Sequence, residues 1–371
     1  MRVTITTCGT STLTDGANSE DIKFLRSNAN KREEQYTPED LARIQKIANE
    51  RRARLLSADE EEARRLSAEL NGFIGYYRRG NGPEEVARDV HYLIHTDTYQ
   101  GKIAAGLLRD WGAARGINLT PIQIDDLNTA SVEEFRMGIN NLVDWCVTAL
   151  PGYRAQGYEV IFNLVGGFKS LQGYMQTLGM FYADETIYIF ETGSELLSIP
   201  RLPVDFAVQA KQSVIDHFDT FRRMQREDLP CAECAGIPET LLYIVDGKCS
   251  LSEWGRVIWG ECQKEAYSQR ILPPASPRVV VSDKVRKQAG GFEQDRIMRL
   301  NQALDKLSRH VETGGKENLH GCDLRKLTGD PVPPATHEFN LWPDMGGWRG
   351  FCHWEGDKLI VDSIDMGLGH S

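Results

Sequence analysis

Three short turns rich in glycine and hydroxyl residues have the composition of anion-binding sites. The turn of Gly166, Gly167, Phe168 and Lys169 is the most distinctive. Two glycines let backbone amides come close to an anion, the N-terminus of a following helix adds partial positive charge, and Lys169 adds a mobile charge. The pattern predicts a phosphate-binding turn, with an ordinary strand–helix turn and an exposed lysine as the alternative.

Two further turns follow apolar runs in the same way. A small, hydroxyl-rich turn after a first strand is a common phosphate or nucleotide site. Because the carboxyl ends of parallel strands meet at one edge of a sheet, all three turns are expected to gather at that edge and bind one ligand. The residues of these two turns are Gly9, Thr10 and Ser11, and Thr96, Asp97 and Thr98.

Strands and helices must alternate to bring the turns together, and the hydrophobic pattern predicts that they do. Short apolar runs are typical of buried parallel strands, and apolar residues between them recur at helical spacing. The alternation predicts a doubly wound, Rossmann-like α/β domain over residues 1–205. The predicted strands are 2–7, 90–95, 119–124, 160–164 and 187–190, with helices at 99–115, after Ser131 and around 171–182.

Residues 18–79 interrupt this alternation with a highly charged stretch. Thr37 and Pro38 mark one helix start, and residues 57–60 fit a capping box that opens a second helix. The pattern predicts a helical insertion, folded as a hairpin. Its charge run is expected to be a solvated face rather than a binding site, with a wall of the ligand pocket or a dimer contact as further options.

After residue 205 the sequence no longer alternates between predicted strands and helices in the same way. Residues 206–277 predict a small helical or winged-helix-like connector, with a long helix at 207–226, two helices around a turn within 238–260, and a proline-rich linker. Residues 278–371 predict an α+β domain, because a helix at 284–311 precedes several alternating, β-rich segments.

Composition narrows the function classes. The chain has 371 residues, enough for two or three domains, and a net charge of −10, which argues against broad, non-specific adhesion to nucleic acid. Among eight cysteines only Cys231 and Cys234 are close in sequence, and reduced thiols are expected rather than a zinc half-site. No apolar run reaches transmembrane length, so a cytoplasmic protein without membrane contact is expected.

The first part of the chain resembles the CARF domains of CRISPR defence. The resemblance rests on the turn at Gly9, Thr10 and Ser11 and on the turn at residues 166–169, and it covers residues 1–205 apart from the insertion. It implies a homodimer that binds a cyclic oligoadenylate messenger in a shared cleft. Cyclic tetra-adenylate is the commonest activator of such domains.

The last part, residues 278–371, resembles the RelE superfamily of ribosome-dependent mRNA endonucleases. The resemblance rests on the run Leu-Arg-Lys-Leu-Thr-Gly at 324–329, on Trp348, and on His337, Asp344, Arg349 and His370. The chain lacks the paired-lysine strand of some members and is more similar to the branch that uses histidine. Together the two resemblances imply a CARF–RelE fusion, an mRNA interferase of type III CRISPR defence activated by cyclic tetra-adenylate.

RNA cleavage without a metal needs a base for the 2′-hydroxyl, charge stabilisation at the phosphate and an acid for the leaving 5′-oxygen. His337 and His370 are the expected proton-transfer groups, because histidine titrates near neutrality. Arg349 is the expected phosphate clamp, since a guanidinium holds two oxygens at once, and Arg325 and Lys326 would grip the backbone. Asp344 belongs to the catalytic set through the family pattern alone. The alternative is that these are surface residues of a small β domain.

Three further expectations complete the sequence-based hypothesis. His353, on a predicted strand beside Trp354, is expected to be structural. No cluster has metal-ligand spacing, so the enzyme is expected to need neither metal nor cofactor. The first domain could also cleave its own messenger slowly, with Lys169 stabilising the developing charge.

A different class of function remains open. The connector at 238–260 could bind DNA, which would make the protein a ligand-responsive transcription regulator. This segment has few basic residues for phosphate contacts, so the ribonuclease hypothesis is preferred.

Overall fold

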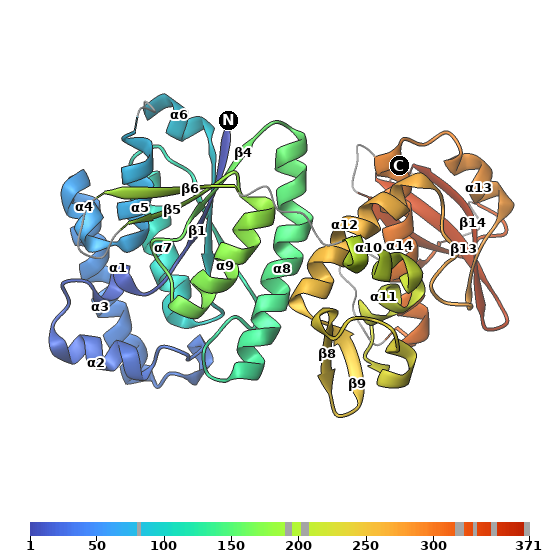
Figure 1. The fold of residues 1–371 in the computed structure, drawn as a ribbon, viewed down its shortest axis with the longest axis horizontal. Helices are drawn as coiled ribbons and strands as arrows, with labels where there is room; N and C mark the ends of the chain where they lie inside the picture. The colour runs from blue at the N-terminus through green and yellow to red at the C-terminus, as the bar shows by residue number, and fades with distance from the viewer. Residues whose placement is uncertain are drawn as a thin grey trace. The chain divides into compact units, whose positions relative to one another are not determined.

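The computed structural model describes residues 1–79, 83–189, 195–201, 208–315, 323–328, 332–342 and 347–366. The chain divides into two compact units, Met1–Asp205 and Phe206–Ser371 (Figure 1). Within the described residues, no helix combines the length and the apolar character needed to cross a membrane.

A six-stranded sheet forms the centre of the first unit, in the order β3-β2-β1-β4-β5-β6. The first five strands are parallel, and β6 joins the edge antiparallel to β5. The strand order reverses between β1 and β4, which makes this point the topological switch of a doubly wound sheet. The strands are β1 (Arg2–Thr7), β2 (Val90–His95), β3 (Leu119–Gln123), β4 (Glu159–Asn163), β5 (Glu185–Ile189) and β6 (Leu196–Pro200). The predicted Rossmann-like alternation is therefore present.

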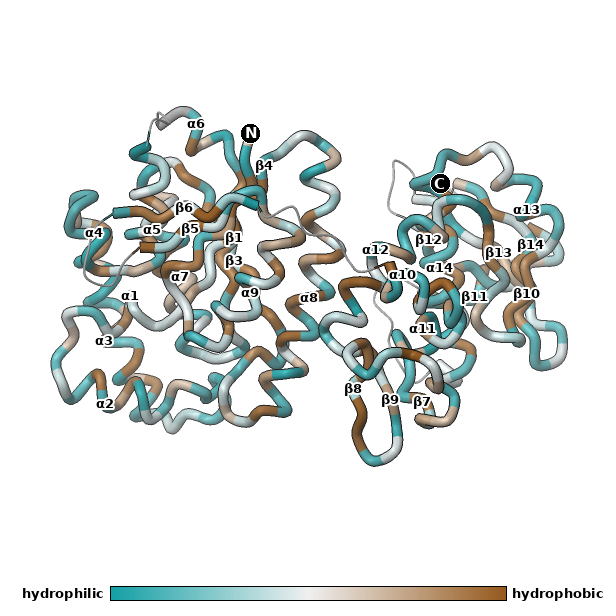
Figure 2. Tube along the Cα trace, in the orientation of Figure 1, coloured by the Kyte–Doolittle hydropathy of each residue, from teal (hydrophilic) through white to brown (hydrophobic). Residues whose placement is uncertain are grey.

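Helices cover both faces of this sheet. On one face α8 (Val132–Ala155) and α9 (Lys169–Tyr182) pack on each other and on β4. On the other, α7 (Tyr99–Ala113) packs on β2 and β3, and a large apolar core joins it to the helices of the insertion. The sheet strands are mostly hydrophobic along the chain trace, as a core between two helical layers requires (Figure 2).

The insertion contains more helices than the predicted hairpin. Its members are α1 (Ser11–Thr14), α2 (Ser19–Ser27), the 3-10 turn η1 (Glu33–Gln35), α3 (Pro38–Ser57), α4 (Glu60–Leu66) and α5 (Ala68–Tyr77), and α6 (Pro83–Arg88) follows. The capping box predicted at 57–60 is wrong, because Ser57 ends α3 and Asp59 caps α4 by accepting a bond from the Glu62 amide. Ser67 then caps α5 and breaks the second predicted helix in two.

The second unit holds two small sheets. The five-stranded sheet has the order β10-β14-β13-β12-β11, all antiparallel except the β10–β14 pair, and its core side packs against α13 and α14. Gly290 and Gly291 separate these two helices where one helix was predicted at 284–311. The elements are β10 (Val279–Val281), α13 (Asp283–Ala289), α14 (Gln294–Glu312), β11 (Arg325–Lys326), β12 (His337–Trp342), β13 (Trp348–Glu355) and β14 (Lys358–Met366).

The connector is a mixed α/β segment rather than a set of helices. The helix predicted before residue 246 is wrong, because this segment forms strand β8 of a hairpin. Asp246 and Gly247 both have positive φ, the geometry of a tight hairpin turn that an Asp-Gly pair favours. The long helix predicted at 207–226 is broken at His217. The elements are α10 (Val208–Asp216), α11 (Phe218–Met224), β7 (Leu229–Pro230), the 3-10 turns η2 (Cys231–Cys234) and η3 (Glu239–Leu241), β8 (Leu242–Val245), β9 (Lys248–Leu251) and α12 (Glu253–Gln269).

A buried polar network ties the connector to the last segment. The Arg222 side chain is 4% exposed, and its guanidinium lies 2.6 Å from the Asp305 carboxylate of α14. It also donates to the Tyr267 hydroxyl of α12 at 3.1 Å and to the Pro273 carbonyl at 2.7 Å. The boundary predicted near residue 278 therefore falls inside one compact unit.

Candidate functional site

The turns after β1 and β4 lie side by side at the carboxyl edge of the first sheet. The two strands are direct neighbours, and the Thr7 hydroxyl at the end of β1 donates to the Gly166 carbonyl at 2.7 Å. The structure thus brings Gly9, Thr10 and Ser11 next to the turn of residues 166–169. This is the switch point of the sheet, where doubly wound folds bind their ligands.

Lys169 and Phe168 begin helix α9 at this edge. Lys169 is exposed and is the first residue of the 14-residue helix. The preceding Phe168 offers no side-chain cap, so the first amides of α9 have no side-chain acceptor at that position. The Phe168 ring packs against Phe135, which in turn packs against Tyr174, with ring centroids 5.8 and 5.9 Å apart. A phosphate here would meet helix amides, a lysine and an aromatic surface.

Glu69 of helix α5 occupies the turn after β1. Its carboxylate accepts hydrogen bonds from the Gly9 amide and the Ser11 hydroxyl, each at 2.7 Å. The Ser67 hydroxyl donates at 2.7 Å and the Thr12 hydroxyl at 3.4 Å. Glu69 is 1% exposed, so these four donors offset the cost of removing a carboxylate from water.

The buried carboxylate affects its neighbours. A side chain at position 166 would collide with the Glu69 carboxylate and force it away from its donors. Burial and the Glu69 charge together raise the pKa of the Asp15 carboxyl and of the Cys8 thiol. Sequence reasoning missed Glu69, which lies within the predicted solvated insertion. The helix cap at Ser67, two residues earlier, is the local signal for this position. The prediction that the insertion could form a wall of the ligand pocket came nearest to the observed role of Glu69.

The turn after β2 serves a separate pocket. The Thr98 hydroxyl caps α7 by accepting from the Gly101 amide at 3.1 Å, and it bonds the Thr96 hydroxyl at 2.8 Å. The Asp97 carboxylate lies 2.6 Å from the Arg32 guanidinium and accepts from Gln123 at 2.9 Å. A cavity of about 450 Å³ opens here, lined by Arg32, Glu33, Glu34, Asp97, Thr98, Tyr99, Lys102, Gln123, Asp125 and Asp126. Its lining is largely acidic and does not include the Gly9 or Gly167 turns.

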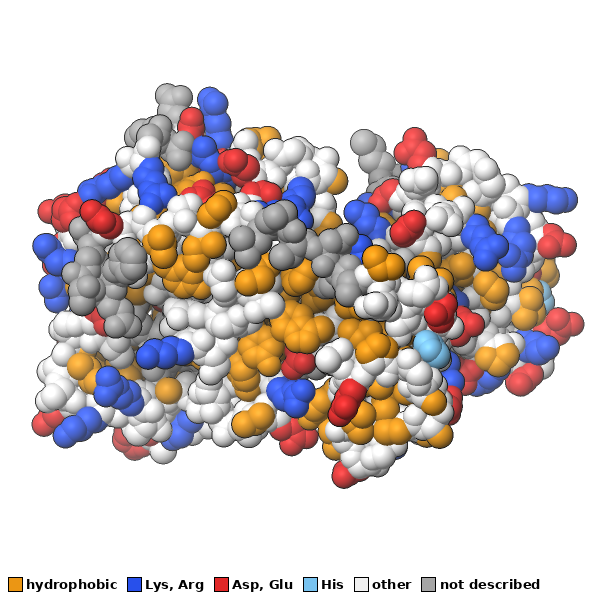
Figure 3. Space-filling view, viewed as in Figure 1, with side chains coloured by type: hydrophobic (Ala, Val, Ile, Leu, Met, Phe, Trp, Pro, Cys, Tyr) orange, Lys and Arg blue, Asp and Glu red, His pale blue; other side chains and the backbone are white. Residues whose placement is uncertain are grey.

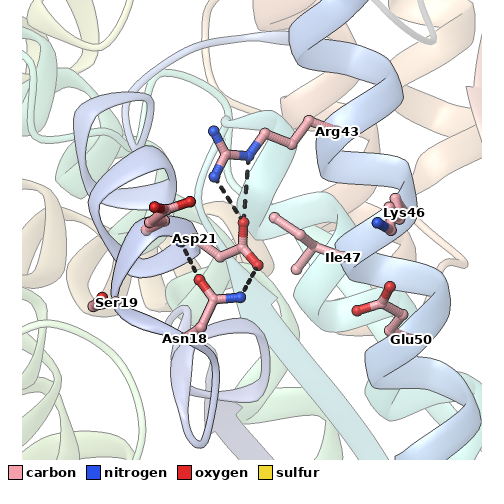
Figure 4. Close-up of a pocket in the computed structure, with 8 residues that line it drawn as sticks. Asn18, Ser19, Asp21, Arg43, Lys46, Ile47 and Glu50 are labelled. Carbon is pink, nitrogen blue, oxygen red and sulfur yellow. Dashed lines mark hydrogen bonds and ion pairs between the residues drawn. The ribbon is translucent and has the colours of Figure 1, made fainter.

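A second cavity, of about 570 Å³, lies between α2 and α3 (Figure 4). Asp21 at its centre is already paired, since it accepts from Arg43 at 2.8 Å and from Asn18 at 2.7 Å. It contains none of the predicted site residues, so we do not assign the ligand to it. Its lining residues are Asn18, Ser19, Glu20, Asp21, Arg43, Lys46, Ile47 and Glu50.

In the second unit, two of the predicted cations converge on one carboxylate. Glu338 is 8% exposed and accepts from the Arg325 guanidinium at 2.6 Å, while the Arg349 Nε lies 3.6 Å from its other oxygen. Arg349 also donates to the Asn340 side chain at 2.5 Å. Arg325 pairs with Glu338 across β11 and β12, and Asn340 pairs with Arg349 across β12 and β13, so these four side chains share one face of the sheet.

Lys326 and His337 lie on the opposite face. They are cross-strand partners, and each is the sequence neighbour of a residue on the arginine face, so the strand alternation turns them away from it. Partial burial and the nearby Lys326 charge lower the pKa of His337. The predicted catalytic residues are therefore divided between two faces. Asp344 and His370, also predicted, lie outside the described residues.

His353 has a partner that the sequence did not reveal. Its Nδ1 lies 2.8 Å from the Asp362 carboxylate across the β13–β14 hairpin. Cys352 belongs to the core on the α14 side, so His353 points to the other side, which Arg349 shares. A carboxylate that orients a histidine is a common arrangement for proton transfer. His353 therefore joins the candidate residues.

The comparisons with known proteins bear on the first unit. No curated protein matches the chain. Residues 64–202 match the model of a family described as CRISPR-associated protein (Cas_APE2256). This segment begins in α4 and contains Glu69 and the turns after β2 and β4, but not the turn after β1. The part of the chain that carries Glu69 and Lys169 is thus similar to a CRISPR-associated protein family.

Proposed function

We propose that this protein is a cyclic-oligoadenylate-activated, ribosome-dependent mRNA endoribonuclease of type III CRISPR defence. One observation carries the proposal: two glycine-rich turns and Lys169 converge at the switch point of a doubly wound sheet, within or beside the segment that matches a CRISPR-associated family. Cyclic tetra-adenylate is the proposed activator. Its ring of phosphates suits a site with helix amides and a lysine.

The proposed ligand contacts differ between the two turns. Lys169 and the start of α9 are exposed and would contact a phosphate directly. The amide of Gly9 already bonds Glu69, so a phosphate at that turn would have to displace the carboxylate. We therefore assign the first phosphate contact to Lys169 and the turn that precedes it.

A homodimer would present this turn twice to a ring with repeating phosphates. Exposed apolar side chains on α8 support a contact surface in the first unit, since Val132 is 77% and Met137 45% exposed. Figure 3 shows hydrophobic side chains gathered in the region of α8 and α9. Sedimentation of the full chain with and without cyclic tetra-adenylate measures this association.

The proposed RNA site is the face that holds Arg325, Arg349 and His353. Arg349 would stabilise the charge that develops on the scissile phosphate, and His353, oriented by Asp362, would move a proton. No metal is assigned a role. The histidine at 370 stays a candidate for the second proton transfer.

The proposal is tested by mRNA cleavage with purified ribosomes. Cleavage is expected only when ribosomes and cyclic tetra-adenylate are both present, with product ends mapped by primer extension. Equal cleavage without the messenger would contradict activation by cyclic tetra-adenylate. Equal cleavage of free mRNA would contradict dependence on the ribosome. Salt-sensitive binding of duplex DNA without RNA cleavage would favour the transcription-regulator alternative.

Messenger turnover is measured in the same reactions. Labelled cyclic tetra-adenylate is followed over hours, because slow cleavage by the first unit would limit the active period. An intact ring would leave the ribonuclease proposal in place and assign the first unit to binding alone.

A further inference from the structure

Three thiols meet in the small sheet of the connector, and the proposed ribonuclease does not use them. Cys231 and Cys234 begin and end η2, and Cys249 lies on β9, which pairs with β7 immediately before η2. The Cys249 thiol donates to the Cys231 sulfur at 2.9 Å. Cys234 is within hydrogen-bonding reach of Cys249 as well. These three residues form the thiol cluster.

The spacing of the thiol cluster is close to that of a zinc ribbon with one ligand replaced. A zinc ribbon uses two Cys-x-x-Cys pairs. Here Cys231 and Cys234 form the first pair. Cys249 begins the second pair, but Ser252 stands where the fourth cysteine would be. The Ser252 hydroxyl donates to the Thr240 carbonyl at 2.7 Å and accepts from the Gly255 amide at 3.1 Å, which commits it to capping α12.

The sulfur geometry also disfavours a shared metal ion. Two thiolates on one tetrahedral zinc ion lie roughly 3.8 Å apart, given Zn–S bonds of about 2.3 Å. The Cys231 and Cys249 sulfurs are closer than this, at 2.9 Å. Across the described part of the chain, no group of three or more histidine, cysteine or acidic side chains is arranged to hold a metal. Cys249 is therefore not explained as a metal ligand.

We infer that Cys231 and Cys249 form a reversible disulfide when a peroxide reaches the cluster, with Cys234 as the thiol that exchanges with it. Peroxide oxidises the Cys231 thiol to a sulfenic acid and releases one water. The Cys249 sulfur then attacks the Cys231 sulfur while its proton passes to the leaving hydroxyl, so that the S–S bond forms and a second water leaves. Two thiols and one hydrogen peroxide thus give one disulfide and two waters.

The accessibility of the thiols sets their order of reaction. Cys231 is partly exposed, whereas Cys234 is 3% and Cys249 1% exposed. Burial raises the pKa of Cys249 to about 12, which keeps this sulfur protonated and protects it from direct oxidation. The partly exposed Cys231 therefore reacts with the oxidant first, and the buried Cys249 then forms the disulfide with it.

Cys234 makes the bond reversible from inside the protein. It contacts Cys249 and also donates to the Met224 sulfur at 3.7 Å, so it stays beside the disulfide once that bond has formed. A third thiol in reach allows thiol–disulfide exchange, which distinguishes labile disulfides from structural ones. Intracellular disulfides are mostly of this transient kind. The bond would close the chain between 231 and 249 and restrain the β8–β9 hairpin.

The sequence permits a direct test on the full-length chain. Trypsin cuts after Arg226, Lys248 and Arg256, so Cys231 and Cys234 fall in the peptide 227–248 and Cys249 falls in 249–256. Reduced protein is treated with hydrogen peroxide, blocked with an alkylating agent, digested and analysed by mass spectrometry. The expected product is a cross-linked pair of these two peptides, lighter by two hydrogen atoms than their sum and lost after dithiothreitol.

Single-cysteine variants show which thiol of peptide 227–248 forms the cross-link. Cys231→Ser is expected to slow cross-linking about ten-fold or more, because it removes the most accessible thiol of the thiol cluster. Cys234→Ser should leave the rate of cross-linking unchanged, and so should Cys262→Ser, a partly exposed thiol of α12 that serves as the control. The inference is overturned if peptide 249–256 remains alkylated, if Cys231→Ser reacts at the normal rate, or if the purified chain holds one zinc ion on these thiols.

Discussion

The amide of Gly9 and the carboxylate of Glu69 are joined by a 2.7 Å hydrogen bond at the switch point of the first sheet. An amide at this position would be expected to serve a ligand phosphate, and the chain supplies its own anion instead. Glu69 comes from the helical insertion, so the insertion takes part in the candidate ligand site. Phosphate and carboxylate would compete for the same donors.

This competition predicts that Glu69→Gln tightens the binding of cyclic tetra-adenylate. Removing the charge while keeping the shape should raise affinity about five-fold, the equivalent of ~1 kcal/mol. The same change should lower the free energy of unfolding by roughly 1–3 kcal/mol, because one of the four donors would lose its acceptor. Calorimetric titration and denaturant unfolding measure the two effects. Glu39→Gln, an exposed carboxylate in the first turn of α3, is the control. Unchanged affinity would show that the phosphates do not approach the Glu69 charge.

Lys169→Ala is predicted to weaken messenger binding about ten-fold or more, since hydrogen bonds to charged groups contribute ~1.5–3 kcal/mol. The loss should shrink at high salt, where exposed charges are screened. Lys23→Ala, an exposed lysine of α2, should bind normally. Lys102→Ala is the informative comparison, because Lys102 lines the cavity beside β2. A larger loss from Lys102 than from Lys169 would move the ligand to that cavity.

The two faces of the second unit predict different effects for two histidines. His353→Ala should lower ribosome-dependent cleavage by about 10²-fold, the usual scale for a proton-transfer group, and His337→Ala should have little effect. Asp362→Asn should lower cleavage less than His353→Ala and shift its pH profile, since Asp362 orients the ring. The reverse ranking of the two histidines would place the reaction on the face of Lys326.

Arg349→Ala is predicted to lower mRNA cleavage by about 10²-fold through loss of charge stabilisation at the phosphate. Messenger affinity should not change. Because Arg349 also bonds Asn340 and neighbours Glu338, unfolding must be measured in parallel to separate catalysis from stability. Arg286→Ala, an exposed arginine of α13, is the matched control. Normal cleavage by a folded Arg349→Ala protein would exclude this face as the active site.

Two buried histidines of β2 predict loss of stability in acid. Burial lowers the pKa of both His91 and His95 from the usual 6.5. The unfolded chain then binds more protons than the folded one, so stability is full above about pH 6.5 and falls as the pH drops below it. Each group contributes a slope of up to ~1.4 kcal/mol per pH unit. Hydrogen exchange of the β2 amides across this range measures the slope. His91→Gln should reduce it, and an equal slope in that variant would assign the effect to other groups.

The sheet of the first unit was predictable because its strands are short apolar runs in a repeated βα pattern. Their order does not follow from that pattern, because doubly wound sheets with the same alternation occur in more than one strand order. The hairpin at β8 was missed, although Asp246 and Gly247 were recognised as a turn. Four residues of apolar character before a turn do not distinguish a strand from a helix end.

The chemistry of the sites was less predictable than the fold. Glu69 lies in a charged stretch, and its burial depends on contacts with Gly9 and Ser11, about sixty residues earlier. The pairing of His353 with Asp362 depends on the register of the β13–β14 hairpin, which includes a bulge after Phe351. Alternation along β12, together with the pairing of Asn340 with Arg349 on β13, likewise decides that His337 and Arg349 face different sides. Such relations follow from register and not from residue type.

The buried Arg222–Asp305 pair sets the smallest piece of the second unit that can be transplanted. A fragment starting at residue 278 would keep Asp305 without its guanidinium, and removing one partner of a buried pair costs about 3–5 kcal/mol. Asn301 would also lose its bonds to the carbonyls of Tyr267 and Arg270. The candidate nuclease segment and the connector therefore have to be kept together. A chimera that joins them to another ligand-binding domain should have its junction before α10, not at the proline-rich linker.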